Sequence, residues 1–203
     1  MKTESIKPQI PARLRFPVTL ALGLVAALFV TGCVVTSVYP FYHPKDVIFD
    51  AALLGVWAEA AKTNADKETW TFEKIDDRTY KLIIVDGDKK TEYDARLFKL
   101  KEQQFLDCLP RERTEGGLPL HHLMRVEAVS RGLEFRLLDY GWLGKLVEKD
   151  PRAIRHIVVP KKADEGDGGD LVLTADTAEL QKFLRKHLKT ADAWTEPVVM
   201  KHP

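Results

Sequence analysis

The feature that most constrains this chain is an alternation of apolar and polar side chains, repeated in one short run after another. In residues 68–75, Trp70 and Phe72 fall on one face. Thr71 and Glu73 fall on the other. Successive side chains of a β-strand point to opposite faces, so this spacing predicts a strand with one buried face. Seven runs of this kind follow each other, at residues 53–60, 68–75, 78–85, 91–100, 103–109, 121–129 and 133–139.

Short turns join most of these runs. Asp86-Gly87 is a strong hairpin signal, because glycine readily adopts the left-handed backbone that a tight turn needs. Consecutive strands with short turns predict an antiparallel meander, and further strands are expected within 154–160, 171–174 and 195–202. Open sheet edges are hazardous, so we expect residues 51–203 to form a mainly β domain that closes into a barrel of about 8–10 strands. Within 91–100 the apolar phase shifts at Phe98 and Leu100, which predicts a bulge.

Helices are few. Residues 175–190 show the clearest helical spacing, with Asp176 and Glu179 placed as a capping box. This C-terminal amphipathic helix is expected to pack on the barrel through a stripe made of Leu180, Phe183, Leu184, His187 and Leu188. A shorter helix is expected at 141–151, ending at Pro151.

The first predicted strand contains Gly55-Val56-Trp57. Together with the strand order and the late helix, this tripeptide resembles the Gly-x-Trp opening strand of lipocalin-like (calycin) barrels. The resemblance covers two residues plus the order of the elements. It implies a meander barrel able to enclose a small apolar ligand. The sequence departs from the family in having no second lipocalin motif.

The N-terminus has the pattern of a targeting segment. Residues 1–15 carry four basic side chains and one acidic side chain, and an apolar stretch follows from Phe16 to Val30. Residues 16–38 contain no charged residue, and about 20 apolar residues are enough for a helix to span a bilayer. Length therefore leaves two alternatives open, a single spanning helix over 16–38 and a cleaved signal peptide.

The end of the apolar stretch favours the signal peptide. Val30-Thr31-Gly32-Cys33 resembles the lipobox of bacterial lipoproteins. The resemblance implies cleavage after Gly32, diacylglycerol on the Cys33 sulfur, and fatty acyl chains such as palmitate. We therefore expect a signal peptide at 1–32, a lipid-anchored tether at 33–50, and attachment to the periplasm-facing side of the cell envelope. In enterobacterial lipoproteins, Asp as the second residue of the mature chain retains the protein at the inner membrane. Val34 stands at that position here, so the resemblance favours the outer membrane.

Five side chains are candidates for lining a pocket inside the barrel: His122, Tyr93, Trp70, Phe72 and Asp139. His122 and Tyr93 would supply polar anchors among apolar neighbours, and the aromatic rings would supply contact area. A structural role is the alternative for each, since histidines with hydrogen-bond partners and aromatic core residues are common. Cys108 is interpreted as a small apolar residue of a strand.

These observations predict a lipid-anchored envelope lipoprotein that binds a small apolar or amphiphilic ligand in its barrel. The alternative is a filled barrel that contacts an envelope protein partner of unknown identity. The net charge of +1 gives no electrostatic case for nucleic acid. The sequence contains no nucleophile elbow, phosphate-binding glycine loop or zinc spacing, so we expect no enzymatic activity, cofactor or metal.

Overall fold

The structure, a computed structural model, describes residues 34–60, 68–112, 117–130, 132–160 and 169–203. Its strands are β1 (Thr36–Ser37), β2 (Val47–Ile48), β3 (Gly55–Glu59), β4 (Thr69–Asp76), β5 (Thr79–Asp86), β6 (Lys89–Leu100), β7 (Gln103–Pro110), β8 (His121–Val129), β9 (Gly132–Leu137), β10 (His156–Pro160), β11 (Gly169–Leu173) and β12 (Val198–Lys201). Its helices are α2 (Tyr140–Lys149) and α3 (Thr177–His187), with 3₁₀ turns η1 (Pro44–Asp46), η2 (Ala51–Leu53) and η3 (Ala191–Ala193).

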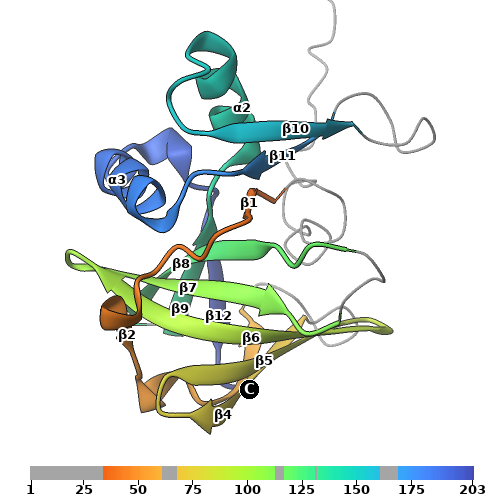
Figure 1. The fold of residues 1–203 in the computed structure, drawn as a ribbon. Helices are drawn as coiled ribbons and strands as arrows, with labels where there is room; N and C mark the ends of the chain where they lie inside the picture. The colour runs from red at the N-terminus through yellow and green to blue at the C-terminus, as the bar shows by residue number, and fades with distance from the viewer. Residues whose placement is uncertain (1–33, 61–67, 113–116, 131, 161–168) are drawn as a thin grey trace, which may run out of the picture.

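Eight strands close into an antiparallel barrel. From β3 to β9, each strand pairs with the next strand along the chain. β12 then pairs with both β9 and β3 and completes the ring (Figure 1). Gly87 lies in the β5–β6 turn with a left-handed backbone, φ 56°, as the hairpin signal predicted. The predicted mainly β fold, its barrel closure and its late helix are confirmed.

Three short strands extend the sheet away from the barrel. β9 pairs with one edge of β8 from Met124 to Val129. β1 pairs with the same edge at the start of β8, where Thr36 lies opposite His122. β11 runs parallel to β1, and β10 pairs with the outer edge of β11. In Figure 1 this extension lies with α2 at the end of the molecule opposite β4.

The described residues form two hydrophobic cores rather than one. The first fills the barrel interior and includes Trp70, Phe72 and Phe135. The second lies outside the barrel, where the outward residues of β6, β7 and β8 meet α2, α3 and β11. Helix α3 buries Leu180, Phe183, Leu184 and His187 there, which confirms most of its predicted stripe.

The second core explains the phase shift in β6. Leu97 faces the barrel interior, whereas Phe98 and Leu100 face the outer core, and all three are fully or almost fully buried. The β6–β7 ladder continues without a register shift from Tyr93 to Leu100. The predicted bulge is therefore wrong, because the apolar run reflects burial on both faces of the strand.

Residues 34–50 belong to the folded body. Val35 and Phe41 are buried in the outer core, and the Phe41 amide donates a 2.8 Å hydrogen bond to Oδ2 of Asp107. The segment expected to be a tether thus contributes a strand and core side chains from Val34 onward. Cys33 and the predicted signal peptide lie outside the described residues. In the part of the chain that the structure describes, no helix has the length and apolar character needed to cross a bilayer.

Helix α3 begins at the predicted cap. The carboxylate of Asp176 accepts a hydrogen bond from the Glu179 amide at 3.0 Å. The Glu179 carboxylate pairs with Arg155, whose Nε lies 2.6 Å away. The cap therefore links α3 to the chain that leads into β10.

Candidate functional site

Aromatic side chains from opposite walls meet across the barrel interior. Trp70 and Phe72 come from β4, and Phe135 comes from β9, which does not neighbour β4 in the sheet. The ring centroids of Trp70 and Phe135 lie 4.7 Å apart, and those of Phe72 and Phe135 lie 6.5 Å apart. At these distances the rings are in contact. Two of the predicted pocket-lining residues, Trp70 and Phe72, thus act in the structure as packed core.

His122 and Tyr93 come together at the mouth of the barrel, with ring centroids 5.8 Å apart in an edge-on arrangement. His122 also lines a hollow of about 230 Å³ between the end of β7 and the start of β8. Burial, and secondarily the charge of His121, lowers the pKa of His122 to about 4, so its imidazole is neutral at pH 7. Burial raises the pKa of Tyr93 well above its usual value. His122 and Tyr93, which were predicted to supply polar contacts to a ligand, therefore lie side by side, and both side chains are uncharged at neutral pH.

Asp139 has a different position. It precedes α2 as the N-cap, and its Oδ1 accepts a 2.6 Å hydrogen bond from the Trp142 amide. Its backbone forms a bridge with Val34. Free helix N-termini need such an acceptor, so the side chain of this candidate is engaged in capping.

A buried His–Asp pair was missed by the sequence analysis. Asp107 on β7 is almost fully buried, and its Oδ1 lies 2.6 Å from Nδ1 of His121 on β8. Ser37 lies opposite His121 in the β1–β8 ladder, which gives the three residue types of a hydrolase triad. The Ser37 side chain is fully buried, however, and its hydroxyl donates to the carbonyl of Leu173. Asp107 therefore contacts both His121 and the Phe41 amide, and so ties the segment that follows β1 to the barrel.

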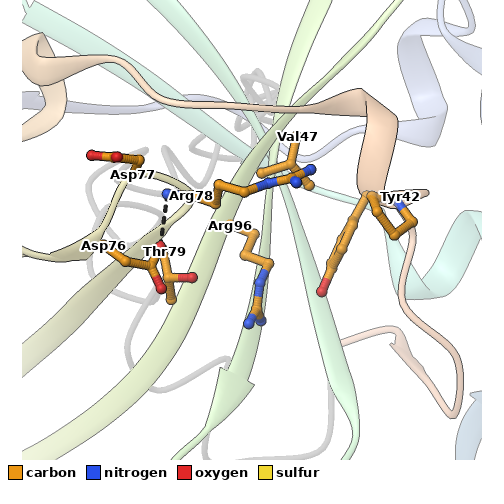
Figure 2. A pocket seen from close by; sticks show the side chains of 8 residues that line it. Tyr42, Val47, Asp76, Asp77, Arg78, Thr79 and Arg96 are labelled. Carbon is orange, nitrogen blue, oxygen red and sulfur yellow. Dashed lines mark hydrogen bonds between the residues drawn. The ribbon is translucent and has the colours of Figure 1, made fainter.

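A larger hollow of about 470 Å³ lies on the outside of the barrel. Three separate parts of the chain form it: the segment around η1 and β2, the β4–β5 turn, and β6. Figure 2 shows the side chains of Tyr42, Arg78 and Arg96 extending from these three parts around the same space. The remaining lining residues are Pro44, Val47, Asp76, Asp77 and Thr79.

The arginines of this outer hollow share its lining with Asp76 and Asp77, but their guanidinium groups do not pair with these carboxylates. The guanidinium of Arg96 lies over the Tyr42 ring, 5.7 Å from its centroid. Across the described ranges, neither Arg78 nor Arg96 forms an ion pair. Asp77 is paired with Lys74 at 2.6 Å. The hollow thus presents two guanidinium groups with donors to spare.

The nearby acidic side chains have hydrogen-bond partners other than the two guanidinium groups. Oδ1 of Asp76 accepts from the backbone amide of Arg78 at 2.7 Å, within the turn itself. Asp107 lies opposite Arg96 in the β6–β7 ladder, but its oxygens are engaged by Phe41 and His121. Burial raises the pKa of Tyr42, while the charge of Arg96 acts in the opposite direction, and the phenol stays protonated at neutral pH.

Among the residues that the structure describes, no three side chains of His, Cys, Asp or Glu lie close enough together to hold a metal ion. Cys108 is buried in the inner core, and burial raises the pKa of its thiol. No protein-family model, curated protein or solved structure matches the chain.

Proposed function

We propose that this protein is a lipid-anchored protein of the bacterial cell envelope whose filled barrel is a rigid scaffold, and that its outer hollow binds a small anionic ligand. The observation that carries the proposal is the pair of arginines, Arg78 and Arg96, that face one hollow without an ion-pair partner in the described ranges. The anchor rests on the lipobox-like Val30-Thr31-Gly32-Cys33.

The packing supports binding outside the barrel. Rings from opposite walls already touch in the interior, so a ligand there would have to displace Trp70, Phe72 or Phe135. Small-molecule pockets commonly measure about 300–1,000 Å³. The outer hollow, at about 470 Å³, falls within that range, and the mouth hollow, at about 230 Å³, falls below it.

The charge supports an anion. A guanidinium presents planar N–H donors that match the oxygens of a carboxylate or a phosphate, often two at a time. The Tyr42 ring and Val47 add apolar contact beside the two arginines. The shared ligand chemistry is therefore a phosphate or carboxylate group attached to a small, partly apolar molecule.

A second candidate is capture of an amphiphilic ligand at the barrel mouth, and the pairing of His122 with Tyr93 beside an exposed Leu118 favours it. This function follows from the lipocalin-like resemblance, with which the consecutive order of the barrel strands is compatible. A fatty-acid fluorophore whose binding is lost in His122→Phe, and kept in Arg96→Gln, would select it over the outer hollow.

The test of the primary proposal is thermal unfolding of the detergent-solubilised protein with inorganic phosphate or succinate added. A ligand at about 100 times its Kd stabilises a protein by about 2.7 kcal/mol. In a chain of this size each kcal/mol raises Tm by about 2–4 °C. We expect one of the two anions to raise Tm in the wild type, and the better anion to identify the group bound.

Arg96→Gln should abolish this rise. The matched control is Arg111→Gln, which removes an arginine that is already paired with Asp94 on the surface. An equal rise in wild type and Arg96→Gln would mean that the anions act as general salts, and the proposal would fail.

A further inference from the structure

Strand β10 exposes three consecutive apolar side chains. Ile157, Val158 and Val159 are 50%, 58% and 43% exposed. Among the strands that the structure describes, β10 is the last one of the sheet extension and pairs with β11 alone. Adjacent strand residues point to opposite faces, so the apolar surface wraps around this edge rather than covering one face. An exposed apolar edge is normally avoided in a monomer, which calls for an environment that covers it.

The position of the N-terminal segment indicates what that environment is. Thr36 of β1 lies opposite Val172 of β11, and Val172 lies opposite Ile157 of β10. Neighbouring strands are about 4.8 Å apart, which puts Ile157 about 10 Å from Thr36. Cys33 precedes Thr36 by three residues, a reach of at most about 11 Å along an extended chain. A lipid on Cys33 would therefore hold the β10 edge within about 20 Å of the point of attachment.

We propose that the β10 edge, formed by Ile157, Val158 and Val159, rests in the headgroup region of the bilayer to which Cys33 is attached. This inference rests on the proposed lipid anchor. It adds a second membrane contact and fixes the orientation of the barrel. In Figure 1, β10 and β4 lie at opposite ends of the molecule, so this contact turns β4 away from the membrane.

The contact is shallow for a physical reason. The outer edge of β10 carries backbone groups without a strand partner in the described sheet, and such groups are costly in the hydrocarbon core. In the headgroup region, water still reaches these groups while the aliphatic side chains contact the acyl boundary. Covalent lipids supply the affinity, so three side chains need only orient a protein that is already held at the surface.

The test places a fluorophore on a single cysteine of the lipidated protein, reconstituted in vesicles that contain spin-labelled phospholipid as quencher. Val158→Cys reports on the β10 edge. Ile75→Cys is the matched control, since Ile75 is also apolar and 47% exposed but lies on β4. The native Cys108 is buried, and the anchor occupies Cys33. We expect lipid quenching of the label at 158 to exceed that at 75 by at least about twofold.

Equal, weak lipid quenching at both positions would overturn the inference. Protection at 158 from both the lipid quencher and aqueous iodide would also overturn it, because that result means a protein partner covers the strand. Intact mass and vesicle flotation of the same samples test the lipid anchor independently of the β10 contact. Protein that carries lipid and floats, but shows no quenching at 158, contradicts the β10 contact alone, whereas protein without lipid contradicts the anchor and the contact together.

Discussion

At the scale of single residues, Phe135 holds the barrel interior together. Its ring contacts both Trp70 and Phe72 from the opposite wall. Replacing a buried phenylalanine by alanine removes apolar contact and leaves a cavity, at a typical cost of about 3–5 kcal/mol. We therefore expect Phe135→Ala to lower the free energy of unfolding by about that amount in urea.

Leu118→Ala is the control for that measurement. Leu118 is large and apolar like Phe135, but it is 65% exposed. Its replacement should change the stability by less than about 0.5 kcal/mol, as is usual for surface sites. If Phe135→Ala lowered the free energy of unfolding by less than about 1 kcal/mol, the interior would be loosely packed. That result would support a ligand cavity inside the barrel.

His122 makes stability depend on pH. Burial lowers its pKa to about 4, from 6.5 in an unfolded chain. Between these values the unfolded state binds more protons, so stability rises with pH. The contribution is fully present above pH 6.5 and is lost as the pH falls towards 4. One pKa unit corresponds to about 1.4 kcal/mol, which gives about 3 kcal/mol in total.

The measurement is urea unfolding of wild type and His122→Gln at pH 7 and pH 4.5. The two proteins share all carboxylates, and burial keeps Tyr93 and Cys108 protonated over this range. The wild type should therefore lose more stability than the variant as the pH falls. An identical loss in both would show that His122 does not titrate as a buried group.

The alternation of apolar and polar residues predicts which face of its own strand a side chain lies on. It does not predict which side chains of different strands lie next to each other. His122 was predicted to line the barrel interior, and the structure places its ring beside that of Tyr93, a residue of the inner core. The Asp107–His121 pair was missed because it joins two strands diagonally, a relation fixed by register. Arg78 and Arg96 were missed for the same reason, since the hollow needs a turn, a strand and a 3₁₀ segment in place together.

At the scale of elements, Asp139 illustrates how a polar residue at a strand end can be mistaken for a site residue. Its carboxylate accepts the Trp142 amide and so begins α2. Loss of an N-cap acceptor typically costs about 1 kcal/mol. We expect Asp139→Ala to lower the unfolding free energy by about that amount and Asp139→Ser to restore most of it.

Binding of the anion in the Tm assay should be unchanged in both variants, because Asp139 does not line the outer hollow. If Asp139→Ala abolished the anion effect at unchanged stability, the residue would be functional rather than a cap.

The β6 strand shows the limit of pattern reasoning for elements. Its run of Leu97, Phe98 and Leu100 matches a bulge as well as a strand buried on both sides. Only the outer core distinguishes the two, and that core is built by residues far along the chain, including Phe183 and Trp194. Helix α3 was easier to predict, since its stripe and cap at Asp176 are both local signals.

At the scale of the whole molecule, the structure is a barrel with a second layer on one side. Closure followed from the number of alternating runs, since a meander of this length must cover its edges. The second layer was not predicted from the sequence, because Val35 and Phe41, which are buried in it, were expected to lie in a tether. Their burial ties the start of the described chain to the β10–β11 extension, and so joins the proposed anchor to the folded body.

The anchor at Cys33 is the claim on which the localisation, the orientation and the bilayer contact all rest. Its most direct test is the intact mass of the membrane-extracted protein, compared with that of Cys33→Ser. We expect a chain that begins at residue 33 and carries diacylglycerol and fatty acyl mass, and an unprocessed chain for the variant. A full-length, unmodified mass for the wild type would contradict the account, because the apolar stretch that begins at Phe16 would then stay attached as an uncleaved segment. The spanning helix predicted over 16–38 would in that case have to end before residue 34, since Thr36 and Ser37 form β1.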